Sequence, residues 1–286
     1  MARWCPCARS TPPACVIGST GKLRIPSTMG WIAPLDEWRI LIRLFGPPRI
    51  VMAEAYGDDT TGARFDHSLL DNLLRRHVRA NGRVDYEALF DDVAQLDDYI
   101  AAVEAVDFHA LSRDEKLALL INAYNAFTLR LVTEHRPLKS IRNIPSRDRW
   151  LGRRWRIGDQ LISLHEIENG WLRARFVEPR IHFAINCASI GCPPLRAGAY
   201  TGAAIDGELA AHTQAVHDDP RWARCDGNIL WLTKVYLWYS GDFTQASGAM
   251  AGFAGRYMPE VAVRLTVGEP PRLRWLPYDW GINALS

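Results

Sequence analysis

The segment KLALLINAYNAFTLRLVTEH at 116–135 constrains the fold more than any other part of the chain. Its apolar residues fall on nearly every side of a helix, and a helix that is apolar all round must be buried. Ser112 precedes the segment and Glu115 follows three residues later, which predicts a capping box at the start of the helix. We expect the helix to end before Pro137.

Shorter patterns predict the elements around this helix. The Asn81-Gly82 pair ends one helix, Ser163 and Glu166 form a second capping box, and the Gly158-Asp159 pair turns a β-hairpin. We predict helices at 69–78, 86–103, 163–176, 201–216 and 248–258, the hairpin at 153–163, a buried strand at 180–187, a strand passing into a turn or helix at 228–239, and a closing strand at 272–280. Because helices come first and strands later, the pattern favours an α+β fold, with N-terminal helices, one of them strongly buried, packed on a small mixed or antiparallel sheet.

The first 60 residues differ in composition from the rest. Residues 1–28 are rich in Pro, Ser, Thr and Gly and hold Cys5, Cys7 and Cys15, which lack the second cluster that a four-ligand metal site needs. Residues 38–55 are mostly apolar and end in a small-x-small pattern typical of signal-peptide cleavage near Ala55. We therefore expect residues 1–60 to form a poorly ordered extension with a signal-like segment, and residues 61–286 to form a single globular domain.

The signal-like segment favours a periplasmic or extracellular location. Because two arginines inside the apolar stretch argue against export, a cytoplasmic location stays open. The formal net charge of +2 is close to neutral and gives no reason to expect a nucleic-acid partner. No run of eighteen or more apolar residues is present, so we predict no transmembrane segment. The expected partner is a small molecule or peptide, and we predict no metal and no cofactor.

Four motifs occur in order along the chain: INAYNAF at 121–127, ISLHEIENGWLR at 162–173, RIHFAINCASIGCPPLR at 180–196 and YDWGIN at 278–283. Together they resemble the family called domain of unknown function 547, over a region from about Phe65 to the C-terminus. The resemblance implies little about activity, because none is established for that family. The family usually has Glu-His where this chain has Glu168-Asn169, so a role that needs an imidazole at that position is in doubt.

Cys187 and Cys192, within the third motif, are the most informative pair of residues. Gly191 permits a turn that would bring the two cysteines within disulfide distance, a bond suited to an exported protein. Alternatively, Cys187 is a reactive thiolate where a strand gives way to free backbone N–H groups. A third possibility is an inert, packed loop, and the sequence does not decide between the three.

His182 lies in the same motif, five residues before Cys187, and is our candidate for the general base. If residues 181–186 stay extended, His182 and Cys187 lie roughly 16 Å apart, at about 3.3 Å per residue. A thiol and its general base need to lie about 3–4 Å apart. His182 can therefore serve as the base only if the chain turns sharply near Asn186.

Asn122 and Asn125 lie three residues apart in the buried helix and therefore on one face. Buried amides need hydrogen-bond partners, so these two either tether the helix to the 182–187 segment or line a pocket beside Cys187. Tyr124, Asn186, Arg196 and Glu166 complete our set of candidate binding residues. We interpret Asp279, in the last motif, as a structural residue that satisfies backbone donors.

Two functions remain open. In the first, the protein is a thiol-dependent hydrolase or acyl transferase in which Cys187 attacks, Asn122 or backbone N–H groups steady an oxyanion, and His182 moves the proton. In the second, it is a non-enzymatic module that binds a small molecule or peptide, and Cys187 and Cys192 are structural.

Overall fold

The computed structural model describes residues 50–145 and 147–285, and its central element is helix α5, Arg113–Glu134. Nearly all of its residues are buried, as the apolar pattern predicts, and it ends before Pro137. The hydroxyl of Ser112 accepts the backbone N–H of Glu115, which is one half of the predicted capping box. The Glu115 carboxylate does not complete the box, because it pairs with Nε2 of His67 at 3.2 Å.

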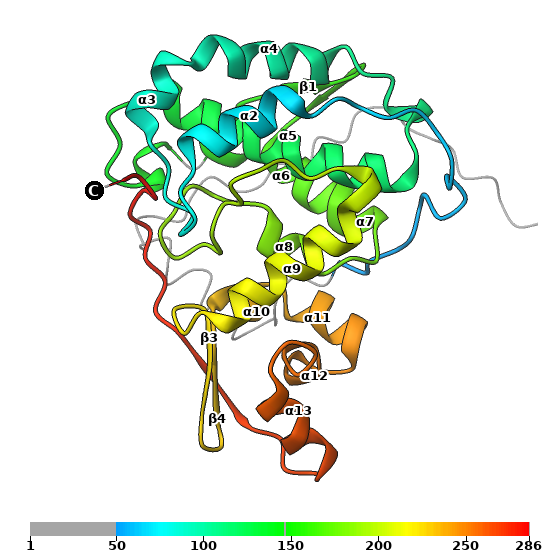
Figure 1. Cartoon of the computed structure of the whole chain (residues 1–286), viewed down its shortest axis with the longest axis vertical. Coiled ribbons are helices and arrows are strands. Elements are labelled where there is room, and N and C mark those ends of the chain that lie inside the picture. Colours follow the sequence, from blue (N-terminus) through cyan, green and yellow to red (C-terminus); the bar gives the residue numbers. More distant parts are fainter. Residues whose placement is uncertain (1–49, 146, 286) are drawn as a thin grey trace, which may run out of the picture.

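A helical layer covers α5 in the upper part of the molecule (Figure 1). It consists of α2, Ser68–His77, α3, Tyr86–Asp91, and α4, Val93–Glu104. The helix predicted at 86–103 is thus interrupted at Asp92. The predicted hairpin forms from β1, Trp155–Ile157, and β2, Gln160–Ile162, with Gly158 at a positive φ of 57° in its turn. The Trp155 ring stacks on Phe127 of α5 at 4.7 Å, so this hairpin is the sheet that α5 contacts.

The rest of the chain forms short helices and a second sheet. The remaining helices are α6, Leu164–Glu166, continued by a π-helical turn at Ile167–Leu172 and α7, Arg173–Arg175; α8, Ile181–Ala184; α9, Ile205–Asp218; α10, Lys234–Trp238; α11, Ser240–Ser247; α12, Met250–Ala254; and α13, Pro259–Thr266. The strands are β3, Ala223–Asp226, β4, Ile229–Leu232, and β5, Arg272–Trp275. β4 pairs antiparallel with β3 and parallel with β5, so the sheet is mixed.

The buried apolar residues form two cores. The first encloses α5 with the helices above it and the hairpin, and the second lies among α9 to α13 and the three-stranded sheet. The α+β class is therefore confirmed, but the three-stranded sheet packs in the second core and not on α5. Helix α8 joins the two cores, since Ile181 and Ala184 belong to the first and Phe183 to the second.

The prediction of a strand at 180–187 was wrong. Residues 181–184 form α8, opened by backbone hydrogen bonds from His182 to Pro179 and from Phe183 to Arg180. Only the residues after it are extended, with Ile185 at φ −84° and ψ 136°. A short apolar run has the same composition in a buried helix as in a buried strand, so periodicity alone could not distinguish the two.

The described chain begins inside the predicted N-terminal extension. Met52 is buried and exchanges two hydrogen bonds with the Gln245 side chain, and Asp59 pairs with the buried Lys116 at 2.5 Å. Contacts with the domain thus start before the predicted boundary at residue 60. Cys5, Cys7, Cys15 and most of the signal-like segment lie outside the residues that the structure describes.

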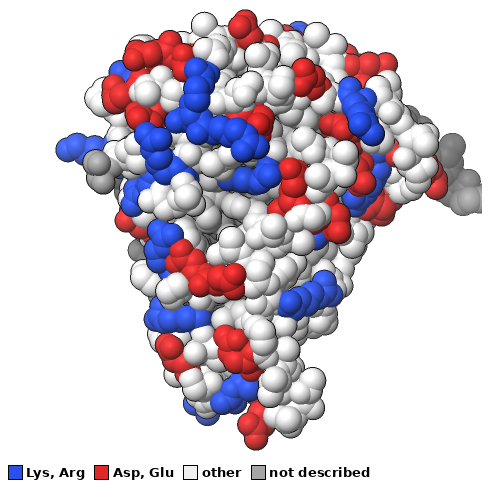
Figure 2. Space-filling model, in the orientation of Figure 1, with Lys and Arg blue, Asp and Glu red and all other residues white. Residues whose placement is uncertain are grey.

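Charged side chains of both signs lie interspersed on the face shown in Figure 2. Within residues 50–145 and 147–285, no helix is long and apolar enough to cross a membrane.

Candidate functional site

The loop after α8 turns back sharply at Asn186. The Asn186 side chain accepts the backbone N–H of Ala188 at 2.7 Å and donates to the carbonyl of Pro193 at 2.8 Å. Ala188 is buried with φ +60°, a left-handed conformation that residues other than glycine rarely adopt. Cys187 is therefore half-buried in a turn, between Asn186, whose side chain bonds to the backbone, and Ala188, whose backbone is strained.

The two amides of α5 hold backbone segments. Asn125 donates to the carbonyl of Ala184 at 3.0 Å and accepts the N–H of Asn186 at 2.8 Å, so it fixes the start of the Cys187 loop. Asn122 makes the same pair of bonds with Tyr200, at 2.7 and 3.0 Å. This is the tethering arrangement, although Asn122 tethers a different segment from the one we expected.

The C-terminal segment lies against the Cys187 loop. Of the closing strand predicted at 272–280, only β5 at Arg272–Trp275 forms, and the segment after it makes single bridges that pair Ser189 with Ile282 and Ser140 with Gly281. The N–H of Asn283 donates to the carbonyl of Ala188, at 3.1 Å. Asp279 accepts the N–H of Gly281 at 2.8 Å, which is the structural role we predicted. This docking brings Tyr278 to the Cys187 thiol.

The Cys187 sulfur is surrounded by hydrogen-bond donors. It lies 2.7 Å from the Ser189 hydroxyl and 3.1 Å from the Tyr278 hydroxyl. Hydrogen bonding from the Cys192 thiol, then from Ser189 and Tyr278, outweighs burial and lowers the pKa of the Cys187 thiol to about 7. This lowering favours the thiolate form of Cys187 relative to an ordinary cysteine.

Cys192 is buried beneath this site. Its sulfur accepts the backbone N–H of Cys187 at 3.5 Å, and the neighbouring Cys187 together with burial raises the pKa of its thiol well above the ordinary value. Both cysteines are free thiols in this structure. The Cys192 thiol donates to the carbonyl of Ile185 at 3.8 Å.

His182 forms no hydrogen bond with the Cys187 sulfur among the described residues. Its ring is fully buried, with Nε2 held at 2.8 Å by Asp242, which also receives a bidentate ion pair from Arg173 at 2.7 and 2.8 Å. The ring stacks on Tyr239 with 3.8 Å between centroids. Burial lowers the pKa of His182 despite the neighbouring carboxylate. Among the described residues, no imidazole forms a hydrogen bond with the Cys187 sulfur.

Glu168 projects from the π-helical turn at 167–172, and its carboxylate accepts a hydrogen bond from the Tyr239 hydroxyl. Burial, and then the charge of Glu168, raises the pKa of both Tyr239 and Tyr124 well above the ordinary value. The two tyrosines thus remain protonated next to the thiol site. Asn169, which replaces the histidine usual in the resembling family, donates to the carbonyl of His165 and accepts from Arg173.

Glu166 and Arg196 lie in local structural contacts. Glu166 completes the predicted capping box with Ser163 and pairs with Arg154. Arg196 pairs with Glu208 at 3.0 Å and lies over the Tyr200 ring. No hydrogen bond or ion pair joins either side chain to the Cys187 loop within the part of the chain that is described.

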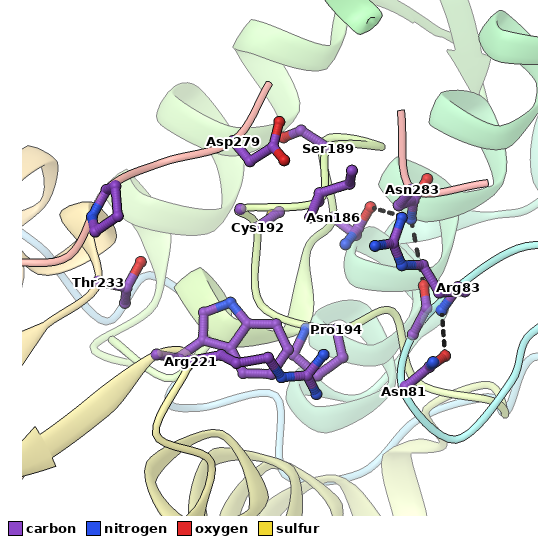
Figure 3. Close-up of a pocket in the computed structure, with 15 residues that line it drawn as sticks. Asn81, Arg83, Asn186, Ser189, Cys192, Pro194, Arg221, Thr233, Asp279 and Asn283 are labelled. Atoms are coloured by element: carbon purple, nitrogen blue, oxygen red, sulfur yellow. Dashed lines mark hydrogen bonds between the residues drawn. The ribbon is translucent and has the colours of Figure 1, made fainter. Parts of the chain in front are cut away.

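A cleft of about 230 Å³ lies beside the Cys187 loop (Figure 3). Asn186, Ser189 and Cys192 border it from the loop, Asp279 and Asn283 from the C-terminal segment. Asn186 and Asn283 are joined by a hydrogen bond of 3.3 Å across its wall. Neither Cys187 nor the amides of α5 line this cleft, so the polar chamber expected between those amides and the thiol is not formed there.

Several residues of the thiol site were missed by sequence reasoning. Ser189, Tyr278, Tyr239 and Glu168 were not among the candidates, although three of them lie within the motifs that carry the family resemblance. The hydroxyl side chains flanking a cysteine in such motifs were the available signal. Their convergence depends on contacts between segments as far apart as residues 187 and 278.

The fold and the site together define an α+β domain that presents a free thiol of lowered pKa among hydroxyl groups. Residues 108–215 match the family model described as "Protein of unknown function, DUF547", and this part of the chain belongs to that family, as the motifs predicted. The matched region contains α5, α8 and the Cys187 loop but not Tyr278. Comparisons with curated proteins and with solved structures gave no match. Across the described ranges, no group of three His, Cys, Asp or Glu side chains is placed to hold a metal ion.

Proposed function

We propose that this protein is a thiol-dependent hydrolase or acyl transferase in which Cys187 is the nucleophile. The supporting observation is the surroundings of its sulfur: a half-buried, free thiol that lies against the hydroxyls of Ser189 and Tyr278 and beside the buried Cys192, with its pKa lowered to about 7. Hydrogen bonds of this kind stabilise the thiolate in the way that an adjacent imidazolium does in other thiol enzymes. Deprotonation by a neighbouring histidine is then not required before attack.

In the proposed reaction, the Cys187 thiolate forms a bond to the carbonyl carbon of an acyl donor, and the carbonyl oxygen takes up the negative charge. As the sulfur loses its charge, the hydroxyls of Ser189 and Tyr278 become free to donate to that oxygen. Collapse of the intermediate breaks the bond to the leaving group and leaves a thioester on Cys187. Water or another acceptor then attacks the thioester, loses its proton to solvent, and regenerates the thiolate.

The absence of a histidine at the sulfur, among the described residues, favours a particular kind of donor. An amine leaving group must be protonated as it departs, which is usually the task of a general acid such as His⁺. A thiolate leaving group needs no such proton. The geometry therefore supports thioesters or similarly activated esters as donors in preference to amides.

Reaction with an acyl thioester tests this proposal. The full chain, reduced, is mixed with an acyl thioester of N-acetylcysteamine, and released thiol and acylated peptides are followed by mass spectrometry. We expect an acyl group on Cys187 and thiol release that is lost in Cys187→Ala. Cys225 is a matched control, because it is also free and half-exposed but burial raises the pKa of its thiol. Absence of both acylation and iodoacetamide labelling at a folded, free Cys187 would refute the proposal.

The cleft beside the loop supports the second candidate, a non-enzymatic binding module. Asn186, Thr233 and Asp279 place polar groups on its wall, and its volume of about 230 Å³ suits a small molecule or the tip of a peptide. Under this proposal Cys192 shapes the wall, and Cys187→Ala leaves binding unchanged. Ligand binding that survives Cys187→Ala but is lost in Thr233→Val would favour this module over the enzyme.

A further inference from the structure

Two arginines near the thiol have no carboxylate partner among the described residues. Arg142 lies over the Trp280 ring, 5.8 Å from its centroid, and Arg149 makes one hydrogen bond, to the carbonyl of Ile144. Other arginines of the same region are paired, Arg147 with Asp148 and Arg153 with Glu134. Arg142 and Arg149 are only partly exposed, so their charges are incompletely solvated. Such unpaired guanidinium groups are the usual means of binding a carboxylate.

The fold places these two arginines at the same junction as Cys187. Ser140, just before Arg142, donates from its hydroxyl to the carbonyl of Trp280, at 2.5 Å, and the bridge between Ser140 and Gly281 continues this contact. The same C-terminal segment pairs with Ser189 through Ile282. The C-terminal segment therefore lies between the segment that carries the arginines and the Cys187 loop, and it contacts both.

The electrostatics of Arg149 agree with this placement. Burial and the nearby charge of Arg142 lower the pKa of Arg149, whereas a thiolate at Cys187 raises it. The two guanidinium groups thus repel each other, and both the thiolate and any further anion bound there would relieve the repulsion.

An aromatic surface adjoins the arginines and the thiol. The rings of Trp238, Tyr278 and Trp280 contact one another with centroid separations of 4.6 to 5.8 Å, and all three are partly exposed. Tyr278 contacts the Cys187 sulfur, while Trp280 contacts Arg142. This surface provides an apolar path between the nucleophile and the cationic pair.

We propose that Arg142 and Arg149 bind a carboxylate of the acyl substrate, so that the substrate class is an anionic acyl compound whose carbon skeleton lies on the Trp238–Tyr278–Trp280 surface. This inference rests on the proposed function of Cys187 and adds the specificity of the same site. Arg142 and Arg149 act in binding and orientation, and the bond-making atom remains the sulfur.

Two alkylating reagents of nearly equal size test the proposal on the full chain. Iodoacetamide is neutral and iodoacetate carries a carboxylate, and each reacts with a thiolate by displacing iodide. The rate of each is measured at Cys187 by peptide mapping, and the ratio of iodoacetate to iodoacetamide rates is compared with that of free N-acetylcysteine. We expect the ratio at Cys187 to exceed the reference by about fivefold, the size of an effect typical of one well-placed ion pair, and to fall to the reference in 1 M NaCl because salt screens the attraction.

Substitutions localise the effect. Arg142→Gln combined with Arg149→Gln should return the ratio to the reference value while iodoacetamide still labels Cys187. Arg147→Gln, which removes an exposed arginine of the same segment, should leave the ratio unchanged. Should the double variant fail to fold, the salt dependence of the unmodified protein carries the same test.

The two proposals fail in different ways. Slow labelling of folded Cys187 by iodoacetamide at pH 6 overturns the nucleophile itself. Fast labelling by iodoacetamide with a ratio equal to that of N-acetylcysteine, insensitive to salt, overturns the carboxylate site and leaves the nucleophile standing.

Discussion

The sulfur of Cys192 lies 3.5 Å from the backbone nitrogen of Cys187 and accepts its hydrogen, while the Cys192 thiol makes the largest contribution to lowering the pKa of the Cys187 thiol. The pKa of the buried Cys192 thiol is raised and that of the neighbouring Cys187 thiol is lowered, while the Cys192 thiol donates to the carbonyl of Ile185. No charged side chain forms a hydrogen bond with the Cys187 sulfur among the residues described, so the reactivity proposed for Cys187 would depend on these neutral groups.

Replacing Cys192 by alanine removes the neighbour that contributes most to lowering the pKa of the Cys187 thiol. We expect the midpoint of the pH dependence of iodoacetamide labelling at Cys187 to rise from about 7 toward the ordinary pKa of a cysteine. Cys192→Ser, which keeps a donor at the position, should raise it less, and Cys225→Ala should not change it. An unchanged midpoint in Cys192→Ala would show that the hydroxyls of Ser189 and Tyr278 suffice.

Asn125→Leu removes the bonds that attach α5 to the Cys187 loop. The carbonyl of Ala184 and the N–H of Asn186 both lose their partner in a buried environment. At about 1–3 kcal/mol for each of these two unsatisfied groups, the free energy of unfolding should fall by about 2–6 kcal/mol. Urea denaturation measures this change, with Asn72→Leu on the exposed face of α2 as the control. A normal unfolding curve combined with altered labelling of Cys187 would instead indicate that the amide lines a ligand pocket.

The half-buried His212 and the buried His217 predict a loss of stability in mild acid. Burial lowers the pKa of His212 and of His217 to about 4, from the ordinary value of 6.5. Below pH 6.5 the unfolded chain takes up protons that the folded chain refuses, so stability falls as the pH drops from about 6.5 to about 4, and the fall ends once the folded state is protonated as well. The difference of 6.5 − 4 pH units corresponds to a maximum of roughly 3 kcal/mol for each histidine.

His217→Gln tests this linkage. The ring of His217 contacts the Tyr236 hydroxyl at 2.6 Å and the carbonyl of Thr213 at 2.7 Å, and glutamine retains polar groups without titrating in this range. We expect the variant to lose less stability between pH 7.5 and pH 5 than the unmodified protein, as measured by urea unfolding at both values. Equal losses in the two proteins would mean that His217 is already accessible to protons in the folded state.

Asp242→Asn breaks the buried ion network of α11. Although burial raises it, the pKa of Asp242 is held below the ordinary value by Arg173 and His182, so its stabilising charge is present at neutral pH and is lost only in strong acid. Without the carboxylate, Arg173 is left as an uncompensated buried charge, at a cost of about 3–5 kcal/mol. Thermal unfolding at pH 7.5 should show a much lower midpoint than that of Asp226→Asn, which removes an exposed pair with Arg224. Similar midpoints for the two variants would contradict this account of the network.

Local patterns in the sequence predicted the elements that local forces define. The all-round apolar character of 116–135 predicted the buried helix, the Gly158-Asp159 turn predicted the hairpin, and the Ser163–Glu166 spacing predicted a capping box that the structure contains. Each of these depends on residues within a few positions of one another. The Ser112 cap formed only in part, because His67, far along the chain, competes for the Glu115 carboxylate.

The sequence by itself determined the α+β class, the buried helix and the resemblance to the family whose model matches residues 108–215. Only the tertiary structure decided that residues 181–184 are helical, that Nε2 of His182 bonds to Asp242, and that Tyr278 contacts the Cys187 sulfur from 91 residues away. The physical reason is that side-chain periodicity records which face of an element is buried but not which distant segment covers it. Register between segments is set by packing and by hydrogen bonds that form only when the whole chain is folded.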